Sequence, residues 1–318
     1  MAEIKIYTLT DTYSIRNDSI MDNIVLDKYV TETERLTLGS VIASQLSFNC
    51  IDKSIPWDNV LGIEYFNNGQ IIFKGYIEEH ELEGDIRHIV ALDVLSAFDI
   101  VVTQEMYNEI FYYRYVSIDE IIRKCIEIAN RYTVKFGAPY STINQLSYQQ
   151  LNVPLNTPDF SEFETATLRN ILQWVCEIIG AVVYTKGINI VLKSIGNKYV
   201  SIKHSEMYSY SHSEKPISVT GIEYTAGEIS GNEIEEKEYF IGTEDKVVSL
   251  SNNPFLAYNG NHGIIQALLD DLKKYKYYPG VIRLAENSFL RDDIDFLDNI
   301  AIYDEENVAR LFLVTHIR

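Results

Sequence analysis

Short segments in which apolar and polar side chains alternate make up most of the first hundred residues. They cover residues 4–9, 45–51, 61–66, 70–78 and 85–95. A period of two residues is typical of half-buried β-strands. The turn Asn67-Asn68-Gly69 predicts a hairpin, because Asn and Gly tolerate the positive φ that a tight turn requires. The segment therefore predicts a compact antiparallel β domain.

The apolar period changes to that of an α-helix at Ser117. Ser117 is the expected N-cap, with Glu120 as the reciprocal cap, and the apolar stripe that follows ends near Asn130. Residues 140–159 are rich in Ser, Thr, Asn and Gln and contain two prolines. They predict a long connection on the surface.

A second amphipathic helix is expected to open at Thr165 or Thr167 and to stop at Gly180. Strands at 181–185 and 188–193 follow it and complete a small α+β unit. From Pro216 onward, strand patterns dominate again, with one further amphipathic helix at 263–275. The expected strands are 217–225, 233–241, 245–250, 277–286, 300–303 and 311–317.

These patterns predict an α+β fold of mostly antiparallel β structure. Two tube-like β-barrel or sandwich domains would flank a smaller, helix-containing α+β domain. We place the first β domain at 1–105, the middle domain at 106–212 and the second β domain, with one helix, at 213–318. A chain of 318 residues, 46% of them apolar, has the material for two or three cores rather than one.

The charge balance limits the kind of partner. With 46 acidic and 27 basic side chains, the formal net charge is −19, which argues against a protein whose main task is to grip phosphate backbones. The 23 tyrosines and 13 phenylalanines suit large subunit interfaces and half-buried sheet faces. A codon bias toward Ile, Lys, Asn and Tyr is an alternative explanation, and both stay open.

Neither a membrane span nor a secretion signal is indicated, so we expect a soluble, unsecreted protein. The three cysteines, Cys50, Cys125 and Cys176, are far apart in the sequence and form no C-x-x-C pair. This spacing predicts reduced core residues rather than a disulfide framework or a zinc site.

No enzyme motif of the G-x-S-x-G, H-E-x-x-H or phosphate-loop type occurs, so we predict no catalytic, cofactor-binding or metal-binding residue and no cofactor. Glu162 and Glu164 could form a pair of carboxylates, but their position before a helix favours an interaction with the helix dipole. A second acidic group lacks the glycine and glutamate of a calcium loop and predicts a solvated turn: Asp292, Asp293, Asp295 and Asp298.

Two further groups of polar residues have structural interpretations. Surface or strand positions are expected for the histidines His80, His88, His204 and His212. Another acidic run, interrupted by Lys237, predicts a solvated strand face and consists of Glu233, Glu235, Glu236 and Glu238. The functional alternative is an acidic wall of a pore through which DNA slides without binding.

Three segments carry a resemblance to known proteins. Residues 31–51 (TETERLTLGSVIASQLSFNCI) lead into a strand hairpin that ends in Phe73-Lys74-Gly75. Residues 167–193 (TLRNILQWVCEIIGAVVYTKGINIVLK) form a helix followed by a hairpin. Residues 253–281 combine an Asn-Pro-Phe start, a helix and Tyr-x-Pro-Gly. In this order they resemble the baseplate hub and tail-associated proteins of tailed phages and phage-tail-like bacteriocins. Where many relatives have Gly-Asp before a closing strand, this chain has Leu297-Asp298, which puts that turn in doubt.

The resemblance implies a structural, non-enzymatic hub: a trimer at the distal end of the tail tube, in which each subunit contributes two β domains around a channel. Three subunits would then present six similar units and adapt a six-fold tube to a three-fold spike. The implied partners are the tail tube or distal tail protein, the spike, the tape-measure protein and other baseplate proteins. DNA would pass through the channel without specific binding.

The implied location is the tail of a virion or tail-like particle that is assembled in the bacterial host cytoplasm. Many relatives carry a C-terminal peptidase, glycosidase or fibre. This sequence stops near Arg318, so none of these is expected. The alternatives are a tail-tip cell-wall hydrolase, with Glu162 and Glu164 or the Asp292 group as acid and base, and a receptor-binding module.

Overall fold

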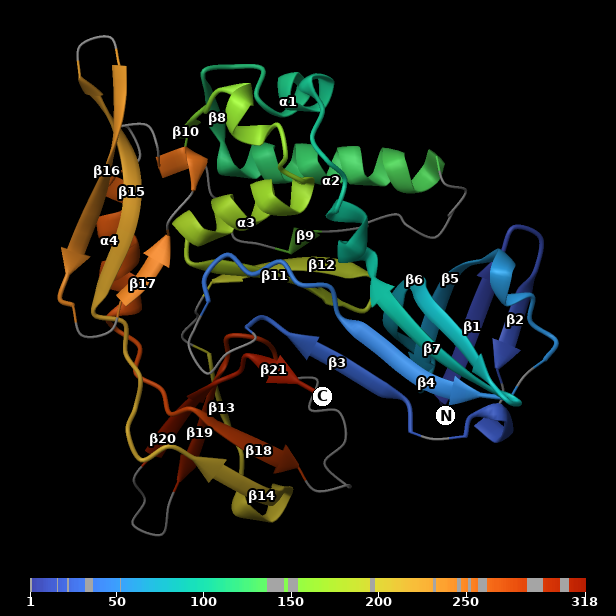
Figure 1. Cartoon of the computed structure of the whole chain (residues 1–318). Coiled ribbons are helices and arrows are strands. Elements are labelled where there is room, and N and C mark those ends of the chain that lie inside the picture. Colours follow the sequence, from blue (N-terminus) through green and yellow to red (C-terminus); the bar gives the residue numbers. More distant parts are fainter. Residues whose placement is uncertain are drawn as a thin grey trace.

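The computed structural model describes residues 2–15, 17–21, 23–31, 37–51, 53–135, 146–147, 154–194, 198–230, 233–244, 247–250, 253–256, 262–284, 294–303 and 309–318. The predicted connection at 140–159 therefore lies mostly outside the described residues. The fold is α+β with mostly antiparallel sheets, as the sequence predicts (Figure 1). No described helix combines the length and apolar character that crossing a membrane requires.

An eight-stranded sheet forms one side of the molecule, in the order β2-β1-β5-β6-β7-β4-β3-β21 (Figure 1). Asn68 (φ 49°) and Gly69 (φ 79°) form the predicted turn between β5 and β6. The last strand of the chain, β21, pairs with β3 and so returns to the N-terminal sheet. The strands are β1 (Ala2–Thr8), β2 (Thr12–Ile15), β3 (Val25–Tyr29), β4 (Gln45–Cys50), β5 (Val60–Asn67), β6 (Gln70–Glu83), β7 (Ile86–Asp93) and β21 (His316–Ile317).

The helical part contains α1 (Gln104–Ile110), α2 (Ile118–Lys135) and α3 (Leu168–Ile178), with the hairpin β11 (Ala181–Lys186) and β12 (Asn189–Ser194) beneath α3 (Figure 1). Thr167 is the N-cap of α3, in a capping box with Asn170, and Gly180 follows the helix at φ 63°. The predicted end of α2 near Asn130 is wrong, because the helix continues to Lys135. Two short strands border the helices: β8 (Tyr115–Ser117) pairs with β10 (Pro154–Asn156), and β9 (Leu146–Ser147) pairs with β12.

The C-terminal part contains three small sheets. A long ribbon of β15 (Gly221–Ser230) and β16 (Glu233–Gly242) packs with α4 (His262–Leu272) and carries β17 (Val247–Leu250) on one edge. A β14–β18 ribbon faces the β13-β19-β20 sheet. These strands are β13 (Tyr199–Ser201), β14 (Met207–His212), β18 (Gly280–Leu284), β19 (Asn299–Tyr303) and β20 (Ala309–Leu313).

Three clusters of buried apolar side chains hold these parts together. The largest runs from Val30 through the helices to Leu313 and includes the buried thiols of Cys125 and Cys176. Cys50 belongs to a second cluster, within the eight-stranded sheet, so all three cysteines are core residues, as predicted. A third cluster lies between the C-terminal ribbon and sheet. The largest cluster contains residues from both sides of the predicted domain boundaries, which lie after residues 105 and 212. The division into three domains therefore stays a prediction.

At Gly39 the N-terminal segment packs closely against α3. Its φ is +74°, and a Cβ at this position would lie 2.5 Å from the carbonyl oxygen of Gln173. We expect Gly39→Ala to lower the free energy of unfolding by about 2 kcal/mol or more. The matched control is Gly69→Ala, which has a similar φ of +79° but no atom within 4 Å and should cost only about 1 kcal/mol. Urea denaturation measures both, and equal losses would show that the close approach has no effect.

Candidate assembly surfaces

Several sheet edges have no partner strand among the described residues. The outer strands are β2 in the large sheet and both strands of the β14–β18 ribbon. An edge strand presents a row of backbone N–H and C=O groups that can pair with another chain. A two-stranded ribbon is marginally stable alone, and here its inner face is supported by apolar contacts that include Val200, Ile302 and Phe312. These edges are candidate contacts between copies of the chain.

The β15–β16 ribbon has two chemically different faces. Tyr224 and Tyr239 lie opposite each other on the inner face, with ring centroids 5.4 Å apart. On the outer face, Glu223 pairs in register with Phe240. Glu238, on the same face, is exposed, as expected for a solvated strand face. The side chains of Glu233, Glu235, Glu236 and Lys237 lie outside the described residues.

A turn with a buried carboxylate connects the C-terminal strands to the β11–β12 hairpin. Asp298 is fully buried and accepts hydrogen bonds from Lys193 Nζ (2.5 Å) and Lys198 Nζ (2.9 Å). The expectation of a solvated turn is therefore wrong for Asp298, because two lysines neutralise its charge. Leu297, the position at which the sequence resemblance leads us to expect glycine, has φ +58° and donates its N–H to Val314 O at 2.8 Å. The turn thus forms in the left-handed conformation that favours glycine.

A second buried carboxylate lies where β7, β11 and the segment before β4 meet. Asp93 is buried, and its Oδ2 accepts hydrogen bonds from Ser44 N (2.9 Å) and Thr185 Oγ1 (2.5 Å), while Oδ1 accepts from Leu95 N (2.9 Å). Burial raises the pKa of Asp93, and these hydrogen bonds oppose that shift. Burial also lowers the pKa of Lys28, although the negative charge of Asp93 acts in the opposite direction. The polar groups fix how the N-terminal sheet meets the middle hairpin.

The other sequence candidates lie in several different elements. Glu162 lies in the turn η4 (Phe160–Phe163), and Glu164 follows it with an exposed side chain. Asp292 and Asp293 lie outside the described residues. The histidines occupy strands or exposed turns, as predicted: His80 in β6, His88 in β7, His204 in η5 (His204–Glu206) and His212 in β14. Among the residues described, no group of three or more His, Cys, Asp or Glu side chains is placed to bind a metal ion.

Sequence reasoning did not find α1 or the exposed tyrosines that follow it. The run Phe111-Tyr112-Tyr113-Arg114-Tyr115 was a visible signal, because Tyr and Arg are enriched at protein interfaces. The short helix before it was harder to recognise, since its seven residues contain only two buried apolar side chains, Met106 and Ile110.

Comparison with known proteins gives a fold but no sequence relative. No protein-family model matches the chain, and no curated protein matches its sequence. A tail protein from Neisseria meningitidis MC58 superposes with a TM-score of 0.56 at 11% identity, covering 99% of this chain and 90% of that one. Prophage tail protein gp18 from Listeria monocytogenes gives 0.54 at 10% identity, with 99% and 89% covered.

The 43 kDa tail protein of prophage MuSo2 from Shewanella oneidensis also gives a TM-score of 0.54, at 9% identity, covering 99% of this chain and 93% of that chain. The similarity extends over almost the whole length of each protein, so it concerns the complete arrangement of sheets and helices rather than one common motif. This chain therefore has the fold of phage and prophage tail proteins, which confirms at the level of the fold the resemblance seen in its sequence.

Proposed function

We propose that this protein is a structural component of a phage tail or tail-like particle, and that it forms the trimeric hub at the distal end of the tail tube. The observation that carries the proposal is the fold shared with three tail proteins over 99% of the chain. Fold alone does not determine function. The open sheet edges add a physical reason, because they are satisfied when copies of the chain associate side by side.

The ring would act through its geometry. Each copy contributes the eight-stranded sheet and the C-terminal sheets, so three copies present six β units around one channel. A six-fold tube and a three-fold spike can then both be matched by one protein. The net charge of −19 suits a channel that DNA traverses, because carboxylates along a wall repel phosphates and provide no binding sites.

The remaining contacts follow from this position. One end of the ring would meet the tail tube or distal tail protein, and the other the spike, with the tape-measure protein ending in the channel and other baseplate proteins around it. The protein would be assembled into the tail in the host cytoplasm. In this role it carries out no catalytic step.

The experiment that tests the proposal is a mass measurement by light scattering during size-exclusion chromatography. We expect three times the mass of one chain, either for the purified protein or after addition of a purified tail-tube protein from the same particle. A bovine serum albumin standard in the same buffer controls for shape effects. A mass of one chain under both conditions, or a stable assembly of another number, would contradict the trimer.

A further inference from the structure

The loop Tyr112–Tyr115, a run of exposed aromatic residues, connects α1 to β8 and includes Tyr115, the first residue of β8. Tyr112, Tyr113 and Tyr115 are 45%, 67% and 55% exposed. Arg114 lies between them, with its guanidinium 5.7 Å from the centre of the Tyr115 ring. Phe111, directly before them, is buried and anchors the loop. Tyr and Arg dominate the residues that contribute most to binding at protein interfaces, so three tyrosines and an arginine in sequence are a candidate contact surface.

Contacts on three sides fix the conformation of this loop. The hydroxyl of Tyr112 donates a hydrogen bond to the carboxylate of Glu120 in α2, and its ring lies 4.4 Å from that of Tyr113. Thr157 donates twice to the loop backbone, from its N–H to Arg114 O (3.0 Å) and from Oγ1 to Tyr113 O (2.7 Å). A surface ordered before binding loses little conformational entropy when a partner arrives.

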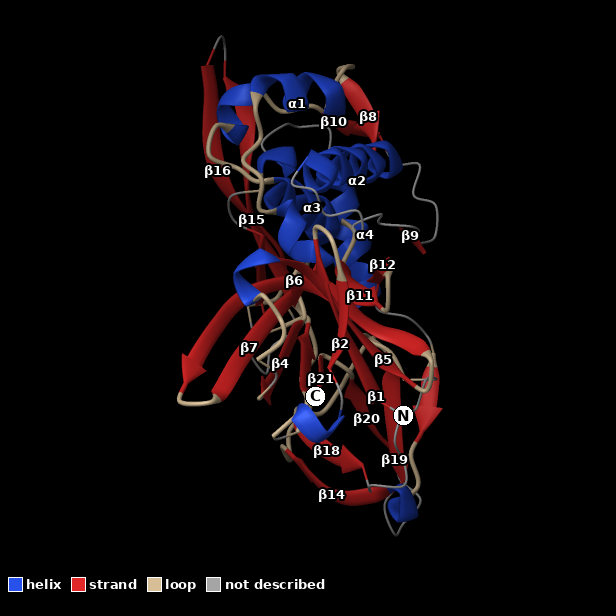
Figure 2. Ribbon diagram, turned by 90° about the vertical axis from the view of Figure 1, so that its right-hand side faces the viewer, coloured by secondary structure: helices blue, strands red, loops and turns tan. Residues whose placement is uncertain are grey.

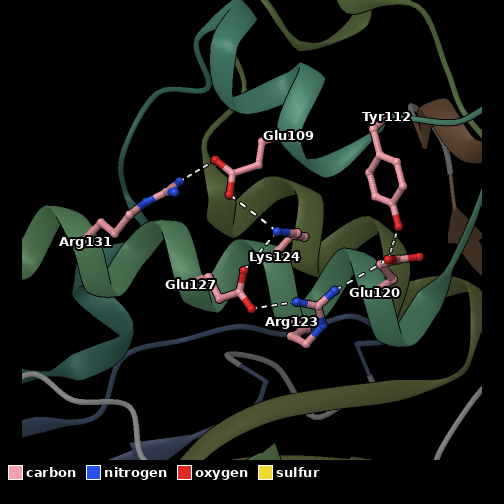
Figure 3. A network of polar contacts seen from close by, with 7 residues as sticks. All are labelled: Glu109, Tyr112, Glu120, Arg123, Lys124, Glu127 and Arg131. Carbon is pink, nitrogen blue, oxygen red and sulfur yellow. Dashed lines mark hydrogen bonds and ion pairs between the residues drawn. The ribbon is translucent and has the colours of Figure 1, made fainter.

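The helices beneath the loop carry a balanced network of charges (Figure 3). Lys124 bridges Glu109 and Glu127, at 3.5 Å and 3.0 Å, and Arg123 lies 2.6 Å from Glu127. The network contains three acids and three bases: Glu109, Glu120, Glu127, Arg123, Lys124 and Arg131. The whole chain has a net charge of −19. The charges of this network cancel and Arg114 adds one positive charge, so an acidic surface can approach the loop with little repulsion.

The outer face of the β15–β16 ribbon has the complementary chemistry. Phe240 is 42% exposed there. Its ring lies over Gly221, where an added Cβ would be 2.8 Å from Phe240 Cζ. The exposed carboxylates of Glu223 and Glu238 flank it on the same face. The two carboxylates can accept hydrogen bonds from the guanidinium of Arg114 and from the hydroxyls of Tyr113 and Tyr115, and the Phe240 ring between them offers an apolar contact.

Figure 2 separates β8 and β10 from the β15–β16 ribbon, and Figure 1 shows both at the same end of the helical part. Among the described residues, no hydrogen bond or ion pair joins the loop to the outer face of the ribbon. The side chains of both surfaces are exposed within one copy, so each can meet a second copy. Such a contact is heterologous, because different patches meet, and a heterologous contact produces a closed ring when the rotation between neighbouring copies closes after three copies.

We propose that the loop Tyr112–Tyr115 of one copy docks on the outer face of the β15–β16 ribbon of the next copy, with Arg114 paired to Glu223 and Glu238. This inference rests on the proposed ring and specifies one of its contacts. It adds a side-chain interface, outside the sheet edges, that determines which copy follows which around the ring.

A charge-reversal series tests the contact by light scattering over a range of protein concentrations. Arg114→Glu places like charges opposite Glu223 and Glu238, and the double change Glu223→Lys with Glu238→Lys places like charges opposite Arg114. Each variant should raise the dissociation constant of the oligomer at least about tenfold, because like charges facing each other cost more than 1.4 kcal/mol. The triple variant restores opposite charges and should recover most of the wild-type affinity.

Controls distinguish the loss of this contact from unfolding of the variant and from the absence of a ring. Lys53→Glu makes the same charge change on an exposed residue beyond β4 and should leave association unchanged, and circular dichroism checks that every variant is folded. Unchanged association of the first two variants, or no recovery in the triple variant, would overturn the docking while the trimer stands. Recovery in an assembly that is not a trimer would support the docking and contradict the hub. A wild-type protein that stays monomeric both alone and with the tail-tube protein would contradict both.

Discussion

Replacing Asp93 by alanine is expected to lower the free energy of unfolding by about 3–5 kcal/mol, as measured by urea denaturation. The carboxylate accepts hydrogen bonds from two buried backbone N–H groups and from Thr185 Oγ1. Its removal leaves these donors without an acceptor, which costs about 1–3 kcal/mol for each buried group. It also removes the negative charge that opposes the lowering of the Lys28 pKa by burial.

The matched control for Asp93 is Asp85→Ala. Asp85 pairs with Lys53 on an exposed turn, so this change should leave the denaturation midpoint nearly unchanged. Equal midpoints for the two variants would show that Asp93 does not organise the junction between the N-terminal sheet and the hairpin.

The pH dependence of stability gives a separate test of Asp93. Burial raises its pKa above the ordinary value of 3.8, so the folded state binds this proton more tightly than the unfolded state. The resulting contribution to stability is fully present below pH 3.8 and is lost as the pH rises through the raised pKa. Asp93→Asn carries no titrating carboxyl and should lack this part of the pH dependence. Parallel curves for the two proteins would contradict the raised pKa.

Replacing Phe163 by alanine is expected to cost about 3–5 kcal/mol as well, because it removes a large side chain from a closed core. Phe163 is fully buried, and its ring centroid lies 5.2 Å from Phe111, 5.7 Å from Trp174 and 6.3 Å from Phe255. These neighbours come from the end of α1, from α3 and from the turn η6 (Pro254–Leu256). The cavity would therefore loosen three segments together.

Two variants control for the effect of Phe163. Phe163→Leu keeps an apolar side chain of comparable volume and should cost less than about 1.5 kcal/mol. Phe160 contacts Tyr107 at 5.4 Å but is only partly buried, so Phe160→Ala should also cost less than Phe163→Ala. Denaturation monitored by tryptophan fluorescence in a Trp57→Phe background reports on this core through Trp174. A loss in Phe163→Ala no larger than in Phe160→Ala would show that the ring cluster does not connect these segments.

Local signals in the sequence predicted the elements that depend on neighbouring residues. The Asn68-Gly69 turn formed because these residues adopt positive φ, and α3 began at Thr167 because its side chain caps the first turn. The end of α2 was less predictable. Helix length past Asn130 depends on packing as well as on the apolar period, so the local pattern did not determine it.

The sequence predicted the two candidate surfaces only in part. The tyrosine excess and the glutamate run were apparent from composition. Their position relative to each other depends on how the chain is folded around α2 and α3 (Figure 2). Spacing along the sequence says nothing about the distance between Arg114 and Glu223 in the folded chain or in a neighbouring copy.

By itself, the sequence determined the strand and helix periods, the turns and caps, the acidic charge and the α+β class, because each depends on residues a few positions apart. Only the tertiary structure decided that His316 pairs with Asp27, 289 residues earlier in the chain, and that Asp298 is buried between two lysines. Such contacts form when distant segments close large loops around a common core, and the free energy that selects them comes from burial, which no local pattern encodes.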